Sequence, residues 1–221
     1  GDQVKAGDAL FVNKFFPEVK FSSPVSGTVT DVVRGERRKV LCVKVKADKE
    51  QTFRDYGQKK VSDLDGGTVK EMLLNAGLFG FINQLPYAVS TTPDVQPKAI
   101  FVSALRDMPL ACDFEMELQG NENAFQTGLT ALSKIAPAYL GIGAHQMSPA
   151  LVSARDVKVT VFQGPCPAGN VGVQVNHLNP VNKGEVVWTV NPSAVIFFGR
   201  LFLTGKVDLT RTIAVAGRKK S

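Results

Sequence analysis

Residues 157–177 read VKVTVFQGPCPAGNVGVQVNH, and this stretch decides how the larger part of the chain is interpreted. Val157, Val159 and Val161 alternate with Lys158 and Thr160, which is the period of a half-buried strand. A loop rich in glycine and proline follows, and residues 171–175 then alternate valine with other residues again. The pattern therefore predicts a strand, a loop and a second strand.

Two interpretations of this loop remain open from the residues alone. Glycine and proline at this density are typical of a tight connection, or of backbone that approaches a ligand closely. A dinucleotide site runs from a strand through glycines into a helix whose N-terminus faces the pyrophosphate. The chain contains neither Gly-x-Gly-x-x-Gly nor Gly-x-x-x-x-Gly-Lys-Ser/Thr. The loop thus follows a strand as a nucleotide-binding loop does, but it lacks the glycine motifs that bind phosphate.

Charge and cysteine content exclude several classes of function. The 221 residues carry a formal net charge of +6, with basic groups at residues 34–39 and 218–220. No aromatic residue is interleaved with these basic groups, so nucleic-acid binding is not indicated. Two interpretations of the basic groups stay open: they are solvated, or they contact an anionic partner or an anionic membrane surface. The three cysteines show no Cys-x-x-Cys spacing, which argues against zinc or iron–sulfur ligation and fits a reducing compartment. No apolar run is long enough to cross a bilayer.

Residues 1–50 have the pattern of a small β domain. Short apolar runs alternate with Gly/Pro turns about every ten residues, which predicts four short strands in a sandwich or barrel. The run Gly-Asp-x-Val-x-x-Gly-x-x-Leu, followed by Ser-Pro-x-x-Gly-x-Val, resembles biotinyl/lipoyl-type domains, which are barrel-sandwich hybrids. In those domains a modified lysine stands about eight residues before the proline. Here Phe16 holds that place before Pro24, and Lys14 is two positions away, so we expect no swinging arm.

The remainder of the chain alternates helical and strand patterns. Polar residues 51–66 are expected to be a linker, and residues 67–221 an α/β domain with a mixed sheet. Thr68 is expected to cap the first helix, and the loop at residues 104–111 is expected at a carboxyl strand end, where open α/β sheets bind ligands. Further helices are predicted over residues 121–135 and 193–203, and strands over residues 98–103, 139–143, 185–190 and 212–217.

The helix at residues 193–203, which Asn191 is expected to cap and Gly205 to follow, is apolar nearly all round, except for Arg200. Such a helix needs cover on every side. We therefore expect it, together with the Gly/Pro loop, either to dock onto a membrane subunit or to lie in the core.

Few residues point to self-sufficient catalysis. His145 and His177 have no partners at the spacing of metal ligands or of a catalytic triad, and Ser26 is not in a Gly-x-Ser-x-Gly turn. A self-sufficient enzyme is not indicated.

Seven short motifs in a fixed order carry a resemblance that covers the whole chain. They are SPVSGTV from residue 23, LLNAGL from residue 73, FVSA from residue 101, FQTGLTALS from residue 125, GPCPAGNVG from residue 164, VW at residue 187 and GRLFLTG from residue 199. In this order they resemble the family formed by the A subunits of the bacterial sodium-translocating NADH:quinone reductase. That family is related to the C subunit of the Rnf electron-transport complex and to the flavoprotein subunit of complex I.

The resemblance implies a peripheral subunit on the cytoplasmic side of the bacterial inner membrane. The whole complex would oxidise NADH, reduce ubiquinone and transport sodium ions, with NAD and FMN or FAD in other subunits and no tightly bound redox cofactor in this chain. Its expected partners are the other subunits, above all the integral-membrane B subunit. Of the histidines that related chains carry after the loop, only His177 is present, because Gln174 and Asn176 stand at the other positions.

The positions expected to contact quinone or a partner subunit are Gly164, Pro165, Pro167, Gly169, Gly172 and His177. Two alternatives remain open: a component like the C subunit of an Rnf complex, and a non-lipoylated carrier or adaptor module. We also expect the lipoyl-like unit to lack its first strands and an SLBB-type region to follow residue 221.

Overall fold

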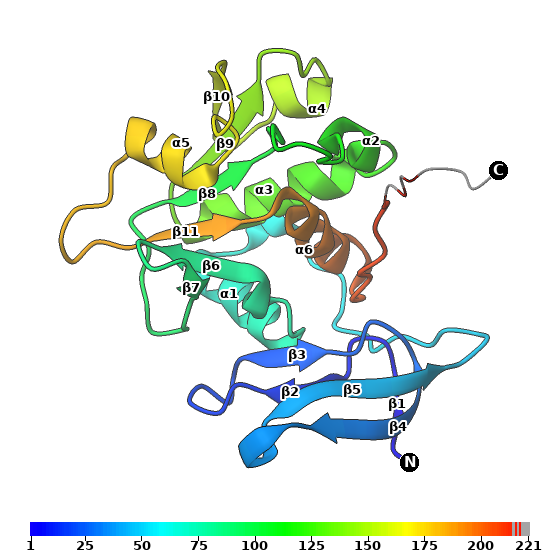
Figure 1. Cartoon of the computed structure of the whole chain (residues 1–221). Coiled ribbons are helices and arrows are strands. Elements are labelled where there is room, and N and C mark those ends of the chain that lie inside the picture. Colours follow the sequence, from blue (N-terminus) through cyan, green and yellow to red (C-terminus); the bar gives the residue numbers. More distant parts are fainter. Residues whose placement is uncertain (214, 216, 218–221) are drawn as a thin grey trace.

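A computed structural model describes residues 1–213, 215 and 217 (Figure 1). The first 47 residues form two small antiparallel sheets, as the turn spacing predicts. One sheet has the order β1-β4-β5, with β1 (Gln3–Val4), β4 (Gly27–Arg34) and β5 (Val40–Ala47). The other pairs β2 (Ala9–Val12) with β3 (Lys20–Ser22). The β-rich beginning of the chain is therefore confirmed, and exposed Lys14 lies in the loop between β2 and β3.

Residues 48–65 lead from this β unit along the α/β domain. The Tyr56 N–H donates to the Gly205 carbonyl at 2.8 Å and the Lys59 N–H to that of Phe202 at 3.1 Å, before the 3-10 turn Val61–Asp63. Helix α1 (Gly66–Asn75) then begins at an Asp65 cap, whose carboxylate accepts from the Thr68 N–H. The prediction that Thr68 is the cap is wrong, because the extended backbone at Asp65 already points its carboxylate at the first turn.

A six-stranded mixed sheet forms the centre of the α/β domain, in the order β10-β9-β8-β11-β6-β7. Four neighbouring strands of this sheet run parallel to one another: β8 (Ile100–Ser103), β9 (Ala138–Gly143), β10 (Lys158–Phe162) and β11 (Val187–Val190). Strand β6 (Ile82–Leu85) follows the 3-10 turn Phe79–Phe81 and runs antiparallel to β11, and β7 (Val89–Ser90) pairs with β6 at the edge. The mixed sheet and the strands near residues 98–103, 139–143, 157–162 and 185–190 are confirmed.

Helices cover both faces of this sheet. Helices α1, α3 (Glu122–Ile135) and α6 (Pro192–Thr204) pack on one face, and α5 (Val171–Leu178) covers the other (Figure 1). The short helices α2 (Phe114–Leu118) and α4 (Pro149–Val152) lie in the connections on either side of α3 and β9. None of the helices in the described ranges has the length and apolar character that a membrane crossing requires.

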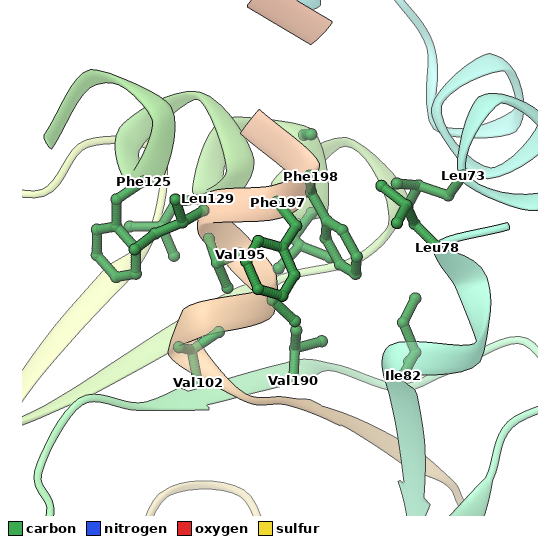
Figure 2. Close-up of a cluster of buried hydrophobic side chains, with 14 of the residues drawn as sticks. Leu73, Leu78, Ile82, Val102, Phe125, Leu129, Val190, Val195, Phe197 and Phe198 are labelled. Carbon is green, nitrogen blue, oxygen red and sulfur yellow. The ribbon is translucent and has the colours of Figure 1, made fainter. Parts of the chain in front are cut away.

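Helix α6 lies in the core, between α3 and the sheet. Its Val195, Phe197 and Phe198 side chains lie between α3 and the strands (Figure 2), and all three are at most 5% exposed. The N-cap Asn191 and the left-handed Gly205 at the C-terminus stand where the sequence predicts them. The expectation that this helix docks onto a membrane subunit is wrong, because the chain's own α3 and sheet already cover its apolar surface.

The segment after the Gly/Pro loop is helix α5, so the predicted strand at residues 171–175 is wrong. Val171, Val175 and Leu178 are spaced by four and three residues, and they pack on one cluster with Phe101 and Val187 of the sheet. A spacing of four fits both a strand and a helix, so the valine alternation was ambiguous. The Asn170 side chain caps the helix by accepting from the Gly172 N–H.

The predicted strand at residues 212–217 includes Ala214 and Ala216, which lie outside the described residues. Thr212 and Ile213 belong to neither a helix nor a strand.

Candidate functional site

The connectivity of the sheet places a topological switch point between β8 and β11. The chain passes from β8 outward to β9 and β10, and then returns through α5 to β11 on the other side of β8. The connection that leaves β8 passes through α3 on one face of the sheet, and the connection that enters β11 passes through α5 on the other face, so the strand order reverses between β8 and β11. Open α/β sheets bind their ligands in the crevice that this arrangement leaves.

A cavity of about 360 Å³ lies at this switch point. Its lining comes from the carboxyl ends of β8 and β11, the loop after β8, the start of α5, the start of α6 and one residue of β6. The lining residues are Asn83, Ser103, Leu105, Arg106, Asp107, Met108, Ala111, Gly169, Asn170, Val171, Thr189, Val190, Asn191 and Pro192. The expectation that the loop at residues 104–111 lies at a ligand-binding edge agrees with this position.

Uncharged polar side chains line the sheet side of the cavity. Asn83 of β6 and Thr189 of β11 are directly paired across the two strands, so both side chains point to the face that carries α5. Among the described residues, neither the Asn83 amide nor the Thr189 hydroxyl has a side-chain hydrogen-bond partner. These two groups can therefore bind the edge of a ligand.

Hydrogen bonds clamp the Gly/Pro loop to the end of β8. The Ser103 hydroxyl donates to the Gly169 carbonyl at 2.9 Å, and Gln174 Nε2 donates to Ser103 Oγ at 2.9 Å and to the Ala168 carbonyl at 3.2 Å. From the other side, Asp107 Oδ2 accepts the Gly169 N–H at 2.9 Å. Buried Gln174, which is 1% exposed, thus holds the loop from within α5.

Most of the backbone donors around the start of α5 are already in use. The N–H groups of Ala168, Asn170, Val173 and Gln174 all donate to backbone carbonyls within the loop or the first turn. The Gly172 N–H donates to Asn170 Oδ1 at 2.8 Å, and Asp107 takes the Gly169 N–H. A phosphate cradle needs several such donors free at once. The loop does not offer them.

The positive charge in the cavity wall is neutralised inside the protein. Arg106 Nη2 lies 3.1 Å from Glu117 Oε2 and donates to Ser193 Oγ at 3.0 Å, while Nη1 donates to the Cys112 carbonyl. Glu117 is only 2% exposed. Arg106 therefore joins the loop after β8 to α2 and α6, and it carries little free charge toward a ligand.

The loops at this edge of the sheet expose large apolar side chains. Met108 lines the cavity and is 61% exposed, and Leu110 in the same loop is fully exposed. Met147 is 75% exposed beside α2, where Glu115 Oε1 accepts its N–H. The Cys166 Sγ lies 3.3 Å from Met108 Sδ, so the Gly/Pro loop contacts this rim. An apolar rim of this kind is typical of an interaction site.

The structure brings only part of the predicted set to the cavity. Gly169 lines it, and Gly172 lies one turn further on, in α5. Gly164, Pro165 and Pro167 lie in the exposed part of the loop. His177 lies at the far end of α5, where its Nδ1 is 2.9 Å from the Val173 carbonyl.

The sequence did not single out Asn83, Ser103 or Thr189 as site residues, and it indicated Asp107 only as part of the loop at residues 104–111. Only the sheet brings these four residues together. Within the same described residues, no group of three or more histidine, cysteine, aspartate or glutamate side chains could hold a metal ion.

Comparison with known families matches both parts of the chain. Residues 1–48 match the NqrA N-terminal barrel-sandwich hybrid domain, and residues 64–207 match the NqrA second alpha/beta domain. Three relatives, each named as the A subunit of a Na(+)-translocating NADH-quinone reductase, come from Yersinia pestis, Vibrio atlanticus and Pseudomonas aeruginosa. Each is 35% identical over 98% of this chain.

The chain spans about half the length of these relatives, since the alignments cover 49% of each. The matched family models together cover most of the chain, and the barrel-sandwich unit followed by the mixed-sheet α/β domain agrees with both. The chain belongs to the NqrA family, whose members are the A subunits of the Na(+)-translocating NADH-quinone reductase.

Proposed function

We propose that the chain is part of a peripheral subunit of the sodium-translocating NADH:ubiquinone reductase complex, where it contributes to quinone reduction coupled to sodium transport. The names of the relatives support this role, and they favour it over an Rnf-type subunit or a carrier module. The complex would lie in the bacterial inner membrane, with this subunit on the cytoplasmic side. Its main partner would be the integral-membrane B subunit.

This subunit has no tightly bound redox cofactor of its own under the proposal. The engaged N–H groups at the start of α5 support this, because a flavin or nicotinamide nucleotide needs its phosphate held there. NAD and FMN or FAD would serve in other subunits, and ubiquinone would be the substrate of the complex.

The observation that carries the proposal is the cavity of about 360 Å³ with an apolar rim at the switch point. A quinone ring is flat and uncharged, and its carbonyl oxygens accept hydrogen bonds of the kind that the Asn83 amide and the Thr189 hydroxyl can donate. The exposed Met108, Leu110 and Met147 side chains would contact the isoprenoid tail or the membrane subunit.

Gly169→Val in the full complex tests the proposal. A Cβ at Gly169 would lie 2.5 Å from both Asp107 Oδ1 and the Leu105 carbonyl, so a valine must displace the loop from the cavity wall. We expect ubiquinone reductase activity to fall at least about tenfold, while NADH oxidation by an artificial acceptor survives. The variant chain should keep its circular dichroism spectrum.

Gly67→Val is the matched control, because a Cβ there meets only the Asp65 carboxylate, at 3.7 Å. Unchanged quinone turnover in Gly169→Val, or an isolated chain that no longer folds, would refute a role of this loop in quinone reduction.

A further inference from the structure

We infer that Asp107 occupies the position that an anionic ligand would take at this strand–loop–helix junction, and that the cavity is consequently a site for uncharged ligands. The inference deepens the proposed function, which places an uncharged quinone in this cavity, and it can be tested on the isolated chain without quinone. Under this inference, Asp107 determines which ligand charge the cavity accepts.

The Asp107 carboxylate lies against the backbone of Gly169. Asp107 Oδ2 accepts the Gly169 N–H at 2.9 Å, and Oδ1 lies 2.5 Å from the place where a Cβ on Gly169 would stand. The carboxylate therefore fills the space that the absent side chain of Gly169 leaves. Glycine at such a junction normally lets a ligand's phosphate approach the backbone. Here an oxygen anion of the protein itself holds that place.

The cavity wall contains two charged side chains of opposite sign. Arg106 and Asp107 are the charged residues in the lining. The guanidinium of Arg106 is bound to Glu117 and Ser193, so the Glu117 carboxylate compensates its charge. The carboxylate of Asp107 has only the Gly169 N–H as its hydrogen-bond donor among the described residues. An anionic ligand would therefore meet a like charge that has no nearby compensation.

The remaining polar side chains that line the cavity are uncharged. Among the described residues, the Asn83 amide and the Thr189 hydroxyl are free to donate and accept hydrogen bonds, whereas the Ser103 hydroxyl is already bound to Gly169 and Gln174. Val171, Val190 and Pro192 supply apolar walls. A flat, uncharged molecule with a polar edge matches this lining, whereas a carboxylate or phosphate does not.

Benzamide and benzoate form a matched pair of probes, because they share a ring and a shape but differ in charge. We would titrate each into ¹⁵N-labelled wild-type chain and follow the amide signals of Gly169, Thr189 and Asn83. The variants are Asp107→Ala, which removes both the carboxylate and the acceptor, and Asp107→Asn, which keeps an acceptor for the Gly169 N–H. Asp48→Ala makes the same change in net charge at an exposed position of the β unit.

In the wild type we expect benzamide to shift these signals and to bind at least ten times more tightly than benzoate. Asp107→Ala should bind benzoate at least ten times more tightly than the wild type does, Asp107→Asn should gain less, and Asp48→Ala should gain nothing. Three results would overturn the inference: wild type that binds benzoate as tightly as benzamide, wild type that binds neither probe, or Asp107 variants that gain no more than Asp48→Ala. If Asp107→Ala loses its native spectrum, the test uses Asp107→Asn, whose gain in benzoate affinity is compared with that of Asp48→Ala.

Discussion

The buried carboxylate of Glu117 links the candidate site to the core through its ion pair with Arg106. Its carboxylate is 2% exposed, and one oxygen binds Arg106 while the other has no hydrogen-bond partner among the described residues. Burying a carboxylate in this way is expensive unless its partner remains in place. Arg106 is also the residue that joins the cavity wall to Ser193 at the start of α6.

Glu117→Ala should therefore destabilise the chain by about 3 kcal/mol, because it leaves the Arg106 guanidinium without its counter-charge. Urea unfolding followed by circular dichroism measures this loss. Asp31→Ala is the control, since the Asp31 and Lys44 side chains are 52% and 61% exposed, and it should cost less than about 0.5 kcal/mol. Equal losses in the two variants would contradict a buried charge at Glu117.

Asp65 gives the chain a predictable response to acid. Hydrogen bonds from the side chain and backbone of Thr68 lower the pKa of Asp65 below its ordinary value of 3.8. Since the folded chain releases this proton more readily than the unfolded chain, the stabilisation is present above that value and is lost as the pH falls through the folded pKa. We expect the wild type to melt at a higher temperature than Asp65→Asn at about pH 6, and this advantage to vanish near pH 2. A difference in melting temperature that does not change with pH would refute the assignment.

At the scale of the elements, two glycines set the distance between α3 and α6. A Cβ at Gly199 would lie 1.7 Å from the Ala124 carbonyl oxygen, and one at Gly128 would lie 2.0 Å from that of Val195. The helix backbones thus touch directly at both points. This close approach lets the chain itself cover the apolar surface of α6 except at Leu203, which is 38% exposed.

Gly199→Ala should destabilise the chain by about 2 kcal/mol or more, because the added methyl group must push the two helices apart. Gly67→Ala, in the exposed first turn of α1, meets only the Asp65 carboxylate at 3.7 Å and should instead stabilise by about 0.5 kcal/mol. Thermal unfolding of the pair gives the comparison. If Gly199→Ala is as stable as Gly67→Ala, the helices do not pack as closely as described.

At the scale of the whole molecule, the β unit is fastened to the α/β domain at the end of α1. The Ser22 hydroxyl of β3 donates to the Ala76 carbonyl at 2.6 Å, and Gly77 lies directly against Ser22. The Tyr56 hydroxyl adds a second tie by donating to the Gly7 carbonyl at 2.8 Å. The two units should therefore unfold together.

Comparing Gly77→Ala with Gly57→Ala distinguishes the effect of disturbing this junction from the effect of backbone strain. Both glycines have left-handed backbones, with φ of 71° and 76°, but a Cβ meets Ser22 Oγ at 2.1 Å at Gly77 and nothing within 4 Å at Gly57. Gly77→Ala should cost roughly 1–3 kcal/mol more than Gly57→Ala. Calorimetry should resolve two transitions only in Gly77→Ala, and identical thermograms would mean that the junction does not couple the units.

The sequence by itself determined the local structure in most places. Gly/Pro turns at regular spacing predicted the β unit, valine and isoleucine runs predicted the central strands, and Asn191 and Gly205 predicted the ends of α6. These signals act over a few residues, through backbone conformation and side-chain period, and so they can be read from the chain alone.

Only the tertiary structure decided that α5 is a helix, that the chain itself covers α6, and where the cavity lies. Valines spaced by two and four residues fit a strand as well as a helix, and α5 became a helix because Val171, Val175 and Leu178 find one apolar patch on the sheet. An all-apolar helix can be covered by its own chain or by a partner, and the glycines of α3 and α6 settled this for α6. Asn83, Asp107, Gly169 and Thr189 meet because strand order, which is a long-range property, brings their strand ends together.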